Sequence, residues 1–361
     1  MLYPLAVQIR AERAGVSARS FVLFLSCAIL FFFFAFRGIR VGVDTKNYCY
    51  VFQYFEHVSL KNVFTAPIYG SNAHTWTFEF EPGYRLINKL LSYMTNDGQA
   101  ITIALGIIIF ILLALFVYRE SPNIWLSMWL FVTLGFFQTS MNATRITIVL
   151  LICFLAFPLI ENRKPVLYVL IVLLASTIHQ SALLFLPVYP LIRFVPLNRR
   201  RVFLIFLLAL FVGLNCSLFS ETLQKIVPSR YARYFSAGND KWISAAVGVF
   251  NLLVVITAVL LLARSERKNV FEGDKVGSWI FFLHICFFAL DIGFKAGART
   301  AALFGPYVVV LVPQILNRIE NASRKRAAVF LIAALCFAQY IARMQINNIG
   351  GTIPYSFFWQ T

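Results

Sequence analysis

Long apolar stretches, repeated along almost the whole chain, constrain this sequence more than any other feature. A helix needs about 20 mainly apolar residues to cross a hydrocarbon core roughly 30 Å thick. Hydrophobic residues make up 60% of the chain and charged residues 13%, whereas a soluble domain has roughly 45–50% and about 25%. A soluble enzyme, a disordered chain and a secreted disulfide scaffold are therefore excluded, and an all-α polytopic membrane protein is predicted. The clearest candidate spans are residues 21–36, 101–118, 124–138, 146–160, 202–218, 243–263, 276–292, 301–316 and 327–342.

A further stretch, residues 166–192, is interrupted by polar residues around His179. We expect two short arms that meet at His179. An arm of ~13 residues at 1.5 Å per residue covers about 20 Å, which would place His179 below the outer surface, lining a wet cavity. Membranes tolerate such breaks only where protein or water satisfies the freed backbone groups. Counting both arms as spans gives eleven transmembrane helices.

The net charge of +17 can be divided between the two sides of the membrane that this arrangement of spans predicts. Of the 32 Lys and Arg residues, 18 fall in short loops on one side, as the positive-inside rule expects for the cytoplasmic side. The N-terminus is then cytoplasmic and the C-terminus outside. The other 14 cations lie outside or within the membrane, where anionic ligands are the simplest use for them. Nucleic acid is not expected as a partner.

Two outer loops are long enough to hold structure, residues 37–99 and 219–242, within an otherwise single membrane domain of residues 1–361. In the first loop, Arg37, Arg40, Asp44 and Tyr48 have the spacing of one helical face. In the second loop, Tyr231 is close to Arg233 in the sequence. Such a mixture of aromatic and cationic residues is typical of the membrane interface, where rings lie among the lipid headgroups and Arg reaches phosphate or sugar. Ordinary interfacial anchoring explains that second segment equally well.

The sequence Glu81-Pro82-Gly83-Tyr84 precedes an apolar pattern over residues 84–94. Proline suits the first turn of a helix, and the pattern predicts an amphipathic helix lying on the membrane surface. Glu81 would then stand just ahead of that helix.

Charged residues also occur at membrane depth. Arg145 opens a span at the outer turn, and Asp291, Lys295 and Arg299 follow one another at intervals of four, with Gly297 allowing close helix approach. Such charges should face the bundle interior. The alternatives are that Arg145 extends to the headgroups, that Asp291 and Lys295 form a structural ion pair, and that His179 is only a hydrogen-bonding spacer. The six cysteines show no close pair, so no disulfide, metal site or cofactor is expected.

Four short motifs resemble one known family. They are Gly42-x-Asp44-x-x-x-Tyr48, Glu81-Pro82-Gly83-Tyr84, Arg145 at the start of a span, and Ile178-His179-Gln180-Ser181-Ala182. Their order and spacing resemble the EpsG-like branch of Wzy-type O-antigen and exopolysaccharide polymerases. The resemblance implies a glycosyltransferase of the bacterial inner membrane, similar to the multi-span glycosyltransferase C class, with the two long loops and the active site on the periplasmic face. Its substrate would be an undecaprenyl-diphosphate-linked glycan within the membrane lipid, and a chain-length regulator protein is a candidate partner.

The residues suit that chemistry. Fixed cations can stabilise a diphosphate leaving group without a metal, and the candidates are Arg145, Arg40, Arg233 and Arg299, supported by Lys295, Tyr48 and Tyr231. An acceptor hydroxyl needs a general base, for which His179 has the most suitable ordinary pKa, with Asp44 and Glu81 as alternatives.

Two other functions remain open. A flippase or transporter of lipid-linked oligosaccharide would also need cations, aromatic residues and a cavity, and a membrane O-acyltransferase could use an embedded histidine. The sequence leaves open the sugars of the repeat unit, the linkage, and whether the anomeric configuration is retained or inverted.

Overall fold

The computed structural model describes residues 16–68, 80–197, 199–226, 253, 275–291 and 295–360. Helices dominate these residues, and the single β-bridge among them joins Arg37 to Phe357. The chain divides into two compact units, residues 1–189 with 336–361, and residues 190–335. The prediction of an all-α membrane protein is confirmed.

Five described helices are long and apolar enough to cross a membrane, or six when one bent pair is counted as a span. The count of eleven spans is not confirmed, and the predicted span at residues 243–263 lies outside the described residues apart from Leu253. The five stretches are Ala18–Ala35, Gln99–Glu120, Thr144–Glu161, Arg299–Asn317 and Ala322–Ile346.

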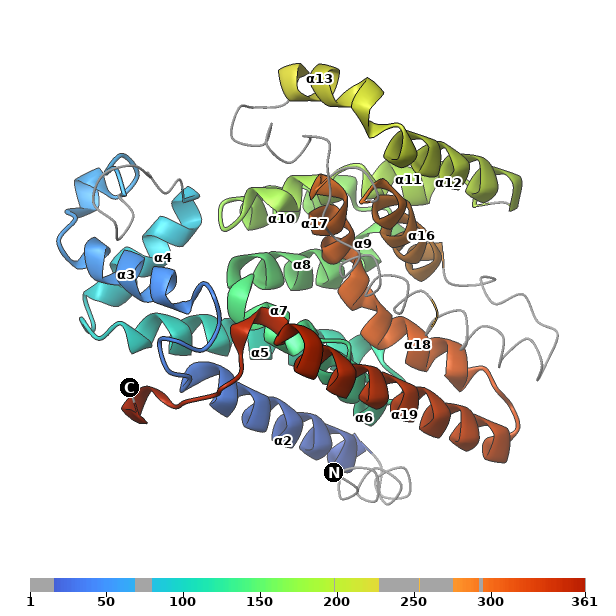
Figure 1. The fold of residues 1–361 in the computed structure, drawn as a ribbon, viewed down its shortest axis with the longest axis horizontal. Helices are drawn as coiled ribbons and strands as arrows, with labels where there is room; N and C mark the ends of the chain where they lie inside the picture. Colours follow the sequence, from blue (N-terminus) through green and yellow to red (C-terminus); the bar gives the residue numbers. More distant parts are fainter. Residues whose placement is uncertain are drawn as a thin grey trace. The chain divides into compact units, whose positions relative to one another are not determined.

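The first unit contains α2 (Val16–Ala35) and the long α5 (Gln99–Glu120), which pack against each other. α8 (Thr144–Ala156), followed by the short α9 (Pro158–Glu161), and α10 (Pro165–Ser176) lie beside them, so that α2, α5, α8 and α10 form successive neighbours (Figure 1). Phe21, Phe24 and Leu174 are each more than half exposed. Apolar side chains turned outward along a helix suit a hydrocarbon solvent rather than water.

The predicted span at residues 124–138 is bent in the structure. α6 (Ile124–Thr133) and α7 (Phe136–Asn142) meet at an angle of 59°. Gly135 stands between them with φ +83°, a left-handed conformation that glycine adopts without steric cost. A Cβ at Gly135 would also lie 3.3 Å from Nη1 of Arg343, which lies on α19 (Ala322–Asn347).

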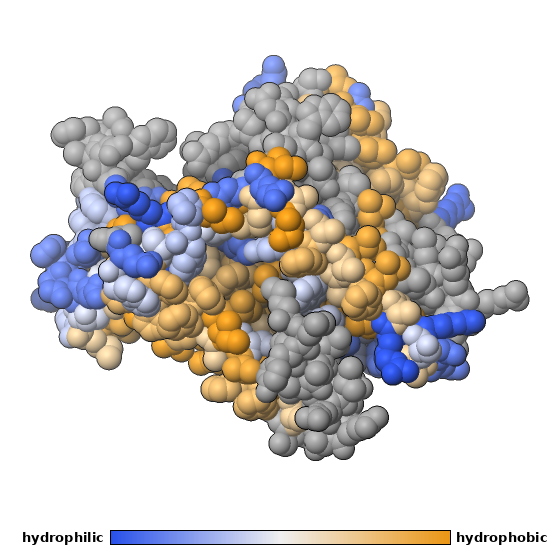
Figure 2. Space-filling view, turned by 60° about the horizontal axis from the view of Figure 1, so that its bottom comes forward, coloured by the Kyte–Doolittle hydropathy of each residue, from blue (hydrophilic) through white to orange (hydrophobic). Residues whose placement is uncertain are grey.

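The first long loop carries α3 (Thr45–Glu56), η1 (Leu60–Asn62) and α4 (Pro82–Ser92). These helices lie at the end of the first unit where α2 finishes (Figure 1). Hydrophilic surface gathers at that end, while apolar side chains cover the middle of the same face (Figure 2). A helix after Pro82 is present and ends at Ser92, with Leu90 exposed on one side and Tyr84 fully buried on the other.

The break at His179 is also present. α10 ends at Ser176, and the chain turns through Thr177–His179 into the 3₁₀ helix η2 (Gln180–Phe185), which leads to α11 (Val188–Phe194). The Tyr168 hydroxyl donates to the Phe185 carbonyl at 2.8 Å, so η2 folds back against α10. With 12 residues, α10 is only about 18 Å long, which is too short to cross a bilayer.

The second unit contains α12 (Arg199–Leu214), α13 (Cys216–Ile226), α16 (Lys275–Leu290), α17 (Lys295–Phe304), η3 (Gly305–Tyr307) and α18 (Val308–Asn317). α19 (Ala322–Asn347) begins in this unit and ends in the first, followed there by η4 (Ile349–Gly351) and η5 (Phe358–Gln360). The predicted loop at residues 219–242 begins as part of α13, and its residues from 227 onward lie outside the described residues.

Candidate functional site

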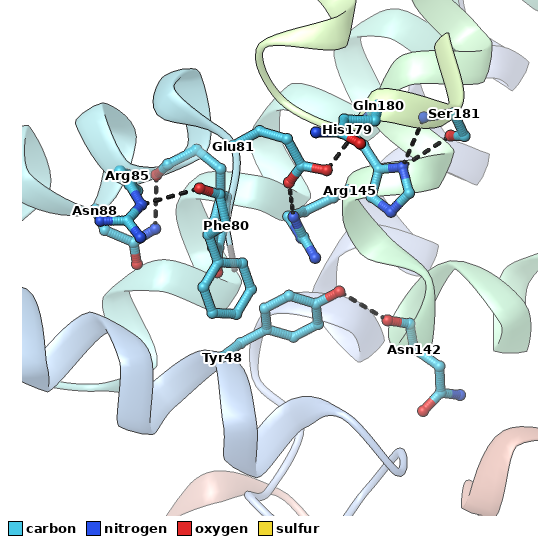
Figure 3. Close-up of polar contacts among 11 residues, drawn as sticks. Tyr48, Phe80, Glu81, Arg85, Asn88, Asn142, Arg145, His179, Gln180 and Ser181 are labelled. Carbon is cyan, nitrogen blue, oxygen red and sulfur yellow. Dashed lines mark hydrogen bonds and ion pairs between the residues drawn. The ribbon is translucent and has the colours of Figure 1, made fainter. Parts of the chain in front are cut away.

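Four segments of the first unit bring the predicted site residues together. They are the turn ahead of α4, the first turn of α8, the turn into η2, and the first half of α3 (Figure 3). The turn ahead of α4 carries Glu81, and the first turn of α8 carries Arg145. The turn into η2 carries His179, and α3 carries Tyr48. The four motifs that resemble the polymerase family therefore meet at one place.

Arg145 and Glu81 form the centre of this cluster. Nη1 of Arg145 donates to Oε2 of Glu81, and the two side chains are only 15% and 12% exposed. The other carboxylate oxygen of Glu81 accepts from the Gln180 backbone N–H at 3.0 Å (Figure 3). The guanidinium also lies over two rings, 4.6 Å from the centroid of Phe80 and 4.9 Å from that of Tyr84. Arg145 therefore does not extend to headgroups as a free surface cation.

Pro82 and Gly83, which follow Glu81, allow α4 to begin close to the end of α10. Pro82 occupies the first helical turn of α4, where its missing N–H costs nothing. The Gly83 and Tyr84 N–H groups donate to the Thr177 carbonyl at 2.7 and 3.3 Å. A Cβ at Gly83 would lie 2.4 Å from Oγ1 and 2.8 Å from the carbonyl oxygen of Thr177. Only glycine lets α4 start this close to the end of α10.

His179 precedes η2 and caps it. Its Nδ1 accepts from the Ser181 backbone N–H at 3.2 Å and lies 2.8 Å from the Ser181 hydroxyl oxygen (Figure 3). The ring is half-buried. The contacts at Nδ1 agree with the interpretation of His179 as a hydrogen-bonding spacer.

Tyr48 covers another side of the cluster from α3. Its ring packs edge-on against Tyr84, with 6.2 Å between centroids, and its hydroxyl donates to the Asn142 carbonyl at 2.9 Å. Burial raises the pKa of Tyr48, and the nearby charge of Asp44 raises it further, while Arg145 acts in the opposite direction. The phenol therefore stays protonated at neutral pH and can serve as a hydrogen-bond donor.

Asn142, which sequence reasoning did not single out, ties Asp44 to the cluster. Its Oδ1 accepts from the backbone N–H groups of Val43 and Asp44, and its Nδ2 donates to the Gly350 carbonyl at 3.0 Å. Gly42, with φ +88°, makes the turn that presents these N–H groups. A polar residue three positions before Arg145 was the available signal, but its partners lie about a hundred and two hundred positions away.

Arg37 was expected to share a helical face with Arg40, Asp44 and Tyr48, but it lies outside α3 and is fully buried. Its guanidinium donates to the carbonyls of Phe34 and Met141 and to the Thr45 hydroxyl. The expected single helical face is therefore wrong for Arg37 and Arg40, because both precede the turn at Gly42 and α3 begins only at Thr45. Arg40 is exposed.

Several other cations counted on the outer side are used in the same way as Arg37. Arg85 donates to the carbonyls of Val63, Ala66 and Phe80, Lys89 to those of Phe55 and Glu56, and Arg343 to that of Leu134. These side chains stabilise the ends of helices and turns, where carbonyl groups lack helical partners. Fewer of the cations counted on the outer side are therefore available to an anionic ligand than the count of charges suggests.

The remaining predicted residues are Tyr231, Arg233, Lys295 and Arg299, and all four belong to the part of the chain that is assigned to the second unit. Arg233 and Tyr231 lie outside the described residues. Lys295 and an exposed Arg299 lie on α17, whereas Asp291 follows the end of α16, so the three do not share one helical face. The close approach predicted at Gly297 is present, since a Cβ there would lie 2.2 Å from the Asp291 nitrogen. Among the described residues, no group of three or more His, Cys, Asp or Glu side chains could hold a metal ion.

Comparison with known proteins adds one finding. The search of curated proteins and the search of solved structures each gave no match. Comparison with protein families matches residues 20–357 to the EpsG family, which is nearly the whole chain and extends well beyond the four motifs. The chain belongs to the EpsG family.

Proposed function

We propose that this protein is a polysaccharide polymerase that joins lipid-linked oligosaccharide repeat units. Membership of the EpsG family supports a polymerase of the glycosyltransferase kind. The donor would be a glycan carried on undecaprenyl diphosphate, and the acceptor a sugar hydroxyl of the next lipid-linked unit. The reaction would take place at the periplasmic face of the inner membrane.

The observation that carries this proposal is the buried Arg145 in its aromatic and acidic surroundings. Nη1 is held by Glu81, and the buried Nε–H donates no hydrogen bond to any described residue. A buried donor without a partner costs roughly 1–3 kcal/mol, and a phosphate oxygen beside the guanidinium would satisfy it. Arginine also presents its five donors in a planar fork that matches phosphate oxygens.

In the reaction, the bond between the donor sugar C1 and the phosphate oxygen breaks, and a bond forms from C1 to the acceptor oxygen. The electron pair of the broken bond leaves with the lipid diphosphate, whose growing negative charge Arg145 would stabilise. The acceptor proton passes to a base, for which Asp44, Glu81 and His179 are the candidates at the cluster. Arg40, Arg233, Arg299, Lys295 and Tyr231 remain proposed contacts of the diphosphate or the sugars.

The test is Arg145→Ala in a strain whose chromosomal copy of the gene is deleted. We expect that the Arg145→Ala protein present in the membrane adds no repeat units, so that the lipid acceptor carries only single repeat units and the ladder on glycan gels is lost. Arg119→Ala is the matched control, because Arg119 is 43% exposed and forms an ion pair with its neighbour Glu120. A full ladder with Arg145→Ala would refute the proposed site.

A second assay separates polymerase from flippase and from acyltransferase. Purified protein in detergent, where no second compartment exists, is mixed with lipid-linked repeats extracted from the deletion strain. We expect products of increasing repeat number from the wild-type protein and none from Arg145→Ala. Unchanged repeats in this assay would favour transport, and repeats that gain acyl groups would favour the acyltransferase.

A further inference from the structure

Glu81 occupies the position of a helix-capping residue, but its side chain does not cap α4. A polar side chain directly before a helix usually accepts from backbone N–H groups of the first turn. In α4 that turn has other partners, because Pro82 has no N–H, and the N–H groups of Gly83 and Tyr84 donate to the Thr177 carbonyl. The Glu81 carboxylate is therefore not needed by its own helix.

Two other segments of the site use both oxygens of this carboxylate. Oε2 accepts from Nη1 of Arg145 on α8, and Oε1 accepts from the Gln180 N–H of η2 at 3.0 Å (Figure 3). The Gln180 donor belongs to the backbone, so it limits rotation of the carboxylate against the guanidinium. The Glu81 side chain is only 12% exposed, which leaves little of it for an acceptor sugar to contact.

The guanidinium of Arg145 is restrained in two directions. The rings of Phe80 and Tyr84, with centroids 4.6 and 4.9 Å from the guanidinium carbon, restrict its tilt. The contact of Nη1 with Glu81 restricts rotation within the guanidinium plane. A planar fork of donors matches phosphate oxygens only in a suitable orientation, and a misplacement of about 1 Å can cost about 10²-fold in rate. The Glu81 contact therefore determines how Arg145 meets a phosphate.

From these contacts we infer that Glu81 is a positioning residue, which orients Arg145 toward the leaving diphosphate, and is not the base of the transfer. This inference rests on the proposed function. A proton accepted by Glu81 would discharge the carboxylate that holds Nη1, at the moment when the leaving diphosphate needs the guanidinium in place. The acceptor proton then passes to another group, for which His179 and Asp44 remain the candidates.

One substitution removes the charge of Glu81 with almost no change in the size of the side chain. Both partners of the carboxylate are donors, whereas an amide has one acceptor oxygen and one NH₂ group. In Glu81→Gln the oxygen can therefore serve only one partner, and the NH₂ group faces the other donor. Glu56→Gln makes the same chemical change at an exposed residue at the end of α3, and it is the matched control.

The effect of Glu81→Gln is measured in two backgrounds, the wild-type protein and Arg145→Lys. Lysine also binds phosphate, but as a point charge with no plane to orient. We expect Glu81→Gln to lower the polymerisation rate by about 10–10²-fold in the wild-type background and to have little effect in Arg145→Lys. Rates are those of the first repeat addition, with the full-length protein and lipid-linked repeats extracted from the deletion strain.

An equal loss in both backgrounds would overturn the inference, because a base or a purely structural residue would be needed whichever cation stands at position 145. An unchanged rate for Glu81→Gln in the wild-type background would overturn it as well. If Arg145→Ala leaves the ladder intact, the proposed function fails as a whole, whereas an inactive Arg145→Ala confines a failure to the role of Glu81.

A spectroscopic measurement decides the case in which one of these variants gives no product or does not fold. The ¹⁵N-arginine spectrum of the full-length wild-type protein, compared with that of Arg145→Ala, assigns the guanidinium signals of Arg145. A guanidinium held at Nη1 rotates slowly, so we expect separate Nη signals, which should merge in folded Glu81→Gln but not in Glu56→Gln. A single averaged Nη signal in the wild-type protein, or separate signals that persist in Glu81→Gln, would overturn the inference.

Discussion

At the scale of single residues, the Arg145–Glu81 pair is both part of the site and part of the fold. Removing one partner of a buried pair leaves an uncompensated charge and costs roughly 3–5 kcal/mol. We predict that Glu81→Ala lowers the thermal unfolding temperature of the purified protein strongly, and that Glu81→Ala with Arg145→Ala lowers it by less than the sum of the single effects. The surface pair Arg119–Glu120 is the control, and its removal should change stability by about 0–1 kcal/mol. Simple additivity at the buried pair would contradict the coupling.

Arg37 gives a second prediction at this scale. Its buried guanidinium serves two carbonyl groups and one hydroxyl that join α2, α3 and α7. Arg37→Met keeps the length of the side chain but leaves these acceptors without their donors, so we expect reduced folded protein in the membrane and earlier unfolding. Arg40→Met, three positions later and exposed, should leave stability unchanged. Equal stability of the two variants in detergent would show that Arg37 is dispensable for folding.

At the scale of elements, the site depends on how closely α4 approaches the end of α10. We predict that Gly83→Ala abolishes polymerisation, because its Cβ would meet the Thr177 carbonyl at 2.8 Å and displace the turn that carries Glu81. Backbone cannot move aside as a flexible side chain can, so Thr177→Ala should not rescue the variant. Gly98→Ala, where the nearest atom is Cβ of Cys49 at 3.3 Å, is the control, and gel ladders are the measurement. A full ladder with Gly83→Ala would show that this approach can relax.

Local sequence predicted the elements of the site better than their connections. The break at His179 and the helix after Pro82 follow from polar interruption, apolar spacing and proline placement, all of which act over a few residues. The roles of Arg37 and Asn142 depend on carbonyl and amide groups about a hundred positions away, which no local pattern encodes. The even spacing of Asp291, Lys295 and Arg299 misled for a related reason, since α16 ends at Leu290 and α17 begins only at Lys295.

At the scale of the whole molecule, the C-terminal segment is hydrogen-bonded to the end of α2 within the first unit. The Phe358 N–H donates to the Phe36 carbonyl at 3.0 Å, and the Gly38 N–H donates to the Ser356 carbonyl at 2.8 Å. The last residues therefore lie beside the C-terminal end of α2. Since α2 is long enough to cross the membrane, we expect an odd number of crossings between the two chain ends.

Cysteine labelling in intact cells tests this topology and the side on which the site lies. Single cysteines at Val43, Met94 and Trp359, which are 72%, 82% and 56% exposed, should all react with a maleimide that cannot cross the membrane. A cysteine at Arg163, in the loop before α10, should react only after the cells are opened. Burial raises the pKa of the native Cys49 thiol to about 11, so its thiolate is scarce at neutral pH and it should contribute little background. Labelling at Met94 but not at Trp359 would place the C-terminus on the other side of the membrane and contradict the hydrogen bonds between the last residues and the end of α2.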